Sequence, residues 1–116
     1  MSAMSPLVRA EAIRIVLAEH RDPRLNVGVI ASRLHISVRN LQRHFATVGG
    51  VWNLITRTRL DSAAAALCAQ PDATIEHIAI ACGFADVNAF RVQFKRRFGE
   101  NPSSYRRRAL AEAQTA

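Results

Sequence analysis

The sequence has few aromatic residues and no long apolar run. Aromatic residues make up 6% of the 116 residues, whereas alanine is frequent, and this balance favours helices over sheets. No run approaches the roughly 20 apolar residues that a membrane-spanning helix needs, and the first residues lack the basic-then-apolar order of a signal peptide. We therefore expect a cytoplasmic protein without a membrane partner.

Cysteine and histidine are too sparse and too scattered to indicate a metal site or an enzyme. Cys68 and Cys82 are the only cysteines, and both lie in Ala-rich, apolar stretches, which favours burial as small hydrophobic residues. The histidines are dispersed, and no Gly-rich phosphate loop follows a strand-like run. We expect no metal, no cofactor and no enzymatic activity.

Acidic residues are absent from Pro23 to Leu60, a stretch that contains six arginines. A second basic block lies near the C-terminus and is opposed only by Glu100; it contains Arg91, Lys95, Arg96, Arg97 and Arg106 to Arg108. The formal net charge is +7. Two basic zones separated by a more neutral one predict a polyanionic partner that is contacted at two places.

Periodicity and capping residues predict an all-α fold of about seven helices, with no convincing strand. The expected helices cover residues 7–20, 27–35, 37–48, 51–70, 75–82, 86–98 and a last segment from Asn101-Pro102. Gly99 fits the left-handed position after the sixth helix. The expected organisation is an N-terminal subdomain over residues 7–50, a linker helix over 51–70 and a C-terminal subdomain over 71–112.

One sequence unit occurs twice. The matching pairs are Ile30 with Ile78, Ala31 with Ala79 and Ile36 with Phe84 at an offset of 48 residues, and Ser37 with Asp86, Leu41 with Phe90 and Phe45 with Phe94 at 49. Each copy reads as a short helix, a tight turn and a capped second helix, which is the pattern of a helix-turn-helix. The alternative to a helix-turn-helix with a binding role is a pair of helical hairpins whose repeat serves only packing.

The helix between the copies has a length that suits DNA. A helix of about 18 residues spans roughly 27 Å, and one turn of B-DNA is about 34 Å. A stiff spacer of this length would allow two reading helices, at about 37–48 and 86–98, to enter successive major grooves.

The segment "IEHIAIACGFADVNAFRVQFKRRFGENPSSYRR" resembles the DNA-binding domain of the AraC/XylS family of bacterial transcription regulators. The resemblance covers about residues 8 to 108, and "IASRLHIS" with "LQRHF" is similar to the less regular first unit of that family. It implies an all-helical domain with two helix-turn-helix units that enter adjacent major grooves and usually activate transcription.

The sequence departs from the family pattern in two places. The segment after the first unit, "GGVWNLI", is shorter than the usual bridge and lacks its Pro and Tyr, so we expect Trp52 or Leu54 to supply the packing. Many members have an Arg in the second reading helix where this chain has Val92, with Arg91 one residue earlier. Base preference in that half is therefore expected to be unusual or based on DNA shape.

The expected contacts with double-stranded DNA fall into two groups. Arginine pairs with guanine and glutamine with adenine, while valine can contact a thymine methyl group. The residues expected to face bases are Val38, Arg39, Gln42, Arg43, Val87, Asn88, Arg91 and Val92. Those expected to contact phosphates are Ser37, Arg57, Lys95, Arg96 and Arg106. Phosphate contact is the alternative for Arg39 and Arg43, packing for Val87 and Val92, and a solvated charge run for Arg106.

The expected function is sequence-specific regulation of transcription in the bacterial cytoplasm, at the nucleoid. The domain is expected to bind as a monomer to an asymmetric site of roughly 20 base pairs, with RNA polymerase as a second candidate partner. A helical module that binds an acidic protein is the alternative function. No sensor domain is recognisable, so we expect either a stand-alone regulator or a fragment of a longer one.

Overall fold

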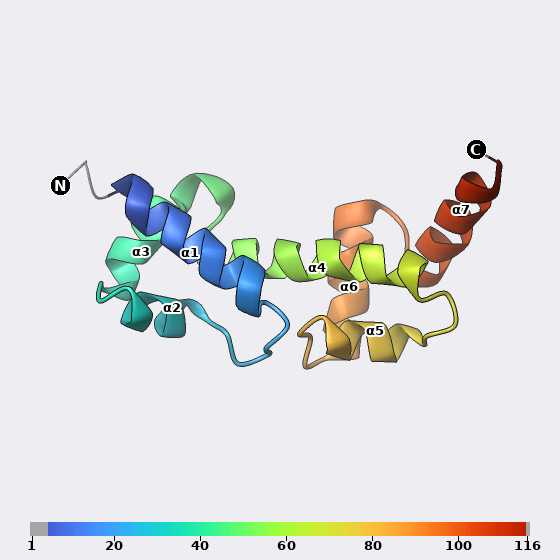
Figure 1. The fold of residues 1–116 in the computed structure, drawn as a ribbon, viewed down its shortest axis with the longest axis horizontal. Coiled ribbons are helices and arrows are strands. Elements are labelled where there is room, and N and C mark those ends of the chain that lie inside the picture. The colour runs from blue at the N-terminus through green and yellow to red at the C-terminus, as the bar shows by residue number, and fades with distance from the viewer. Residues whose placement is uncertain (1–4, 116) are drawn as a thin grey trace. The chain divides into compact units, whose positions relative to one another are not determined.

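Among residues 5–115, which the computed structural model describes, the chain forms seven α-helices, one short 3-10 helix and no strand (Figure 1). In chain order they are α1 (Ser5–Glu19), α2 (Val27–Arg33), α3 (Val38–His44), the 3-10 helix Ala46–Val48, α4 (Val51–Ala69), α5 (Ile75–Ala81), α6 (Val87–Phe98) and α7 (Pro102–Thr115). The predicted all-α class with seven helices is confirmed.

The chain divides into two compact units, Met1–Thr58 and Arg59–Ala116. The division lies inside α4, which the sequence predicts as a linker. Val51 and Ile55 near its start are buried in the core of the first unit, whereas Leu60 and Leu67 are buried in that of the second. Each half of α4 is therefore part of a folded unit rather than a free-standing spacer.

The core of the first unit is built around α3. Both α1 and α2 pack against this helix (Figure 1), and Leu41, Ile30 and Ala12 are fully buried between them. Phe45 at the end of α3 is 3% exposed, so it anchors this end of the helix in the core. These contacts fix which side of α3 remains exposed to solvent.

The core of the second unit contains a cluster of aromatic rings. Phe90 and Phe94 of α6 are fully buried, and their ring centroids lie 5.6 Å apart. The ring centroid of Tyr105 in α7 lies 5.3 Å from those of both Phe94 and Phe98. Such tilted and edge-on ring pairs add about 0.5–1.5 kcal/mol beyond the area they bury, so they hold α6 firmly against α7.

Backbone hydrogen bonds repeat in the two units. After the first helix of each copy, the N–H of Ile36 donates to Ala31 at 3.1 Å and the N–H of Phe84 donates to Ala79 at 3.0 Å. The second helix then begins at a capping residue. These caps accept backbone N–H groups: Ser37 from Asn40 at 3.0 Å, and Asp86 from Asn88 at 2.9 Å. The duplicated helix-turn-helix inferred from sequence is therefore present in both copies.

The ends of the second helices also match expectation in part. Gly99 follows α6 with φ of 82° and donates its N–H to Lys95, as predicted. After the first copy, Val51 and Ile55 are fully buried and Leu54 packs against them. The expectation that Trp52 or Leu54 supplies this packing is confirmed for Leu54, whereas Trp52 is 54% exposed.

None of the helices within residues 5–115 is long and apolar enough to cross a membrane.

Candidate nucleic-acid interface

The exposed face of α3 carries two arginines. Leu41 and Phe45 turn into the core, and the other side of this helix leaves Val38, Arg39 and Arg43 exposed. Among residues 5–115, neither Arg39 nor Arg43 forms a hydrogen bond or ion pair. Both guanidinium groups are therefore available to an anion or to an acceptor on a base edge.

Gln42, which the sequence places in the base-facing set, has a structural partner. Its side-chain oxygen accepts the backbone N–H of Val51 at 3.0 Å, a group that would otherwise lack a partner in the first turn of α4. A Cβ atom on Gly50 would lie 3.2 Å from the same oxygen. Gln42 is half-buried and ties α3 to α4, while its amide NH2 donates no hydrogen bond among residues 5–115 and remains for other contacts.

In the first unit the acidic residues are paired with arginines outside α3. Ion pairs join Glu11 to Arg14, Asp22 to Arg24 and Glu19 to Arg33. The hydrogen bond from Arg33 lowers the pKa of the Glu19 carboxyl, because it favours the charged form. Arg39 and Arg43 of α3 are among the arginines of the first unit that these acidic residues leave unpaired, so the exposed face of α3 carries positive charge.

The face of α6 that matches the exposed face of α3 combines exposed and half-buried residues. Asn88 and Val92 are exposed, the latter by 58%, whereas Val87 is half-buried and packs against the core. Arg91 is half-buried and donates to Glu76 of α5 at 2.7 Å. The structure thus places Asn88, Arg91 and Val92 where a ligand can reach them, and gives Val87 a packing role.

Lys95 and Arg96 extend the exposed basic surface along α6. Neither forms a hydrogen bond or ion pair within the described part of the chain. Arg97 beside them makes a two-pronged ion pair with Asp61, at 2.8 and 3.1 Å. Arg57 on α4 is exposed and has no such partner among residues 5–115. Three of the expected phosphate ligands, Arg57, Lys95 and Arg96, are therefore accessible.

Arg106 takes a role that the sequence does not predict. Its Nε donates to the carbonyl of Leu67 at 2.9 Å, and a terminal nitrogen donates to that of Gln70 at 3.1 Å. These carbonyls lie at the C-terminal end of α4, where a cation also interacts favourably with the helix dipole. Its guanidinium ties α7 to α4 through two of its five N–H donors, and the other three remain for the predicted phosphate contact.

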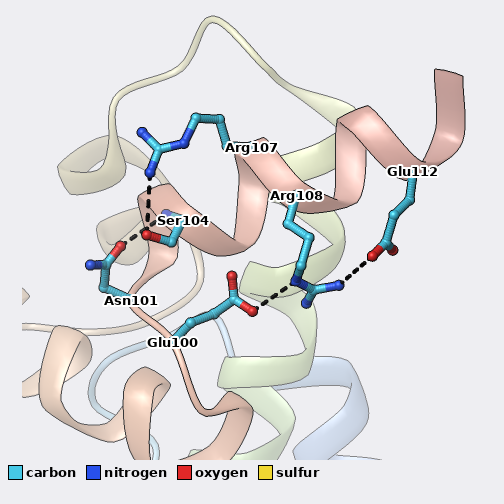
Figure 2. A network of polar contacts seen from close by, with 6 residues as sticks. All are labelled: Glu100, Asn101, Ser104, Arg107, Arg108 and Glu112. Atoms are coloured by element: carbon cyan, nitrogen blue, oxygen red, sulfur yellow. Dashed lines mark hydrogen bonds and ion pairs between the residues drawn. The ribbon is translucent and has the colours of Figure 1, made fainter. Parts of the chain in front are cut away.

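The neighbouring arginines of α7 belong to a polar network (Figure 2). Arg108 donates to Glu100 at 2.8 Å and to Glu112 at 3.0 Å, while Arg107 donates to Ser104 at 3.3 Å. The two carboxylates raise the pKa of Arg108, chiefly through the hydrogen bond to Glu100. Much of the positive charge in this part of the basic block is therefore neutralised by nearby carboxylates.

Glu76 and Asp61 are the residues near the basic surface that sequence reasoning missed. Both pair with arginines of α6 that are 15 and 36 positions away. The only available signal for Glu76 was that it is the sole acidic residue of α5. Within residues 5–115, no three metal-ligating side chains lie together.

Comparison with known proteins gives a consistent result. A family model described as a helix-turn-helix domain matches residues 30–108. The HTH-type transcriptional activator RhaS of Pectobacterium carotovorum is 35% identical over 92 residues, which are 78% of this chain and 33% of that protein. The chain thus spans about a third of the length of the relatives that it matches.

Two solved structures share the fold. The DNA-binding domain of AdpA, a global transcriptional factor solved in complex with a target DNA, is 25% identical with a TM-score of 0.82, covering 92% of this chain and 96% of that one. The C-terminal domain of AraT, a response regulator from Geobacillus stearothermophilus, is 28% identical with a TM-score of 0.79, covering 88% and 84%.

Proposed function

Because this chain belongs to the AraC/XylS family of helix-turn-helix transcription regulators, we propose that it binds double-stranded DNA at specific sequences and thereby controls transcription. The observation that carries the proposal is the exposed pair Arg39 and Arg43 on a capped, well-anchored second helix. Their charge is uncompensated within the described part of the chain. A domain built only for packing has no need of such a pair.

In the first unit, Arg39 and Arg43 read base edges and Val38 contacts a thymine methyl group. An arginine held bidentate to guanine discriminates against the wrong base by about 1–3 kcal/mol. Gln42 contributes to this set indirectly, since its bond to Val51 fixes the end of the reading helix. Ser37 caps that helix and lies at its N-terminal end, where backbone N–H groups and the helix dipole favour a phosphate.

In the second unit, Asn88 and Arg91 provide polar readout and Val92 provides an apolar contact. Asn88 suits adenine and Arg91 suits guanine. Lys95 and Arg96 contact phosphates, as does Arg57 from the first unit, because all three cations are exposed and without ion pairs in residues 5–115. Val87 is not in this set, since it packs against the core.

The two reading helices occupy successive major grooves of one site of roughly 20 base pairs, bound by a single copy of the domain. The presence of a helix-turn-helix in each unit, with matching turn hydrogen bonds to Ala31 and Ala79, supports this arrangement. The units follow one another head to tail in sequence, so the site need not be palindromic.

Activation of transcription in the bacterial cytoplasm is the regulatory outcome we propose, with RNA polymerase as a protein partner. The matched relatives named as transcriptional activators support this. No feature of the described residues favours the alternative of a module for an acidic protein.

The test is selection of bound duplexes from a random pool, followed by titration of the enriched duplex and an unrelated one across a salt series. We expect one enriched sequence, and an affinity that falls with salt with a log–log slope near −0.9 for each phosphate contacted. No enrichment, together with salt-independent binding, would contradict the proposal. A variant with Arg39 and Arg43 both changed to alanine is the matched control for the carrying observation.

A further inference from the structure

The second reading helix contains an arginine that is held by a carboxylate. A terminal nitrogen of Arg91 donates to a carboxylate oxygen of Glu76 at 2.7 Å, and the two side chains are 41% and 57% exposed. Glu76 belongs to α5, the first helix of the same helix-turn-helix. The contact therefore joins the two helices of the motif on the side where α6 is open to solvent.

The first unit has no equivalent of this pair. The offsets that align the two copies, 49 for the second helix and 48 for the first, place Gln42 opposite Arg91 and Gly28 opposite Glu76. Gly28 has no side chain, and Gln42 is engaged with Val51. Repetition of the fold alone thus does not require the Glu76–Arg91 contact.

One carboxylate contact leaves Arg91 able to read a base. A guanidinium has five N–H donors, and Glu76 accepts through one oxygen, so enough donors remain for the two acceptors of guanine. The carboxylate also repels phosphate oxygens nearby, which favours a base edge over the DNA backbone as the target of Arg91. Because a flexible arginine loses rotamer freedom on binding, holding it in advance lowers that loss.

We propose that Glu76 is a specificity-determining positioning residue: it holds Arg91 so that the second unit prefers guanine at one position of the site. This inference rests on the proposed function, because it assigns a role within the same DNA contact. The first unit reads bases with unpaired arginines, whereas the second uses an arginine that a carboxylate holds in place.

The test uses the full chain and the duplex enriched by the wild type. The base pair read by Arg91 is identified as the one at which Arg91→Ala relaxes base preference. We expect Glu76→Ala to lower the preference at that base pair about two- to fivefold, since exposed ion pairs are weak. Arg91→Ala should lower it about fivefold or more. In the Arg91→Ala background, Glu76→Ala should have no further effect on base preference.

Two controls separate positioning from charge and from folding. Asp72→Asn removes a negative charge four residues away, at an exposed position, and should leave base preference unchanged. Glu76→Gln keeps an oxygen acceptor and should fall between the wild type and Glu76→Ala. Thermal unfolding of each variant reports any loss of structure.

The outcomes are distinct. Unchanged base preference in Glu76→Ala, an equal loss on all duplexes, or an effect that persists without Arg91 would each overturn the inference while leaving the proposed function intact. Failure of the wild type to enrich any duplex would overturn the proposed function, and the inference with it.

Discussion

His35 and Gly83 occupy equivalent positions in the turns of the two helix-turn-helix units, and both adopt a positive φ, 57° and 104° respectively. Each lies one residue after the end cap of the preceding helix, Leu34 or Cys82. The turn therefore requires left-handed backbone in both copies. His35 lies within the small region that ordinary residues can reach, whereas the angle of Gly83 lies outside it.

We predict that Gly83→Ala destabilises the second unit by about 1–2 kcal/mol, because a Cβ atom is strained at that φ. His35→Gly is the matched control. It relieves a smaller strain but increases the freedom of the unfolded chain, so its stability should change by less than about 1 kcal/mol. Urea unfolding measures both, and equal losses for the two variants would contradict this account of the turn.

Arg43→Ala and Arg57→Ala should have different effects on DNA binding. Arg43 lies on the reading face, so its loss should relax base preference in one half of the site by about 1–3 kcal/mol. Arg57 is assigned to a phosphate, so its loss should weaken all sequences alike and reduce the salt slope by about 1. Titration of the enriched duplex and of single-base variants distinguishes them, and identical profiles for both variants would refute the assignment.

Arg106→Ala should reduce stability rather than DNA specificity. The change removes two hydrogen bonds to the carbonyls of Leu67 and Gln70, which we expect to cost about 1–3 kcal/mol since the donor is charged. Arg107→Ala is the control, because among residues 5–115 Arg107 donates only to the hydroxyl of Ser104 in its own helix. If Arg106→Ala kept full stability but lost DNA affinity, Arg106 would be a phosphate ligand after all.

The Glu19–Arg33 pair should make the first unit sensitive to acid. The hydrogen bond from Arg33 lowers the pKa of Glu19 below its ordinary value of 4.5. Stability from this pair is therefore present above pH 4.5 and is lost as the pH falls through the lowered folded-state pKa. Between pH 6 and pH 3, the melting temperature of Glu19→Gln should fall less than that of the wild type. The difference should shrink at high salt, because the pair is exposed; a difference of the opposite sign would contradict it.

The elements of the fold were predictable because local signals agree with one another. Capping residues such as Ser37, Asp86 and Gly99 mark the helix ends, and the periodic apolar residues, including Phe45 and Phe94, mark the core faces. These signals act within a few residues, so a single sequence contains them. The duplication adds to these signals, because the same pattern of caps and apolar residues occurs in both copies.

The partners of individual polar side chains were not predictable. Gln42, Arg91 and Arg106 stand at positions that suit DNA contacts, yet each bonds to a group on another helix. Those partners lie between 9 and 39 residues away in sequence, and no local pattern fixes which of several donors reaches them. For the same reason the sequence predicts α4 as a linker, although its two halves belong to different cores.

Footprinting of the enriched duplex with hydroxyl radicals tests the central claim most directly, that one chain reads DNA with two helix-turn-helix units. We predict two protected segments, centred about one helical turn apart on one side of the duplex, with the segment next to the first unit lost in the variant lacking both Arg39 and Arg43. Protection of a single groove segment, unchanged in that variant, would contradict it.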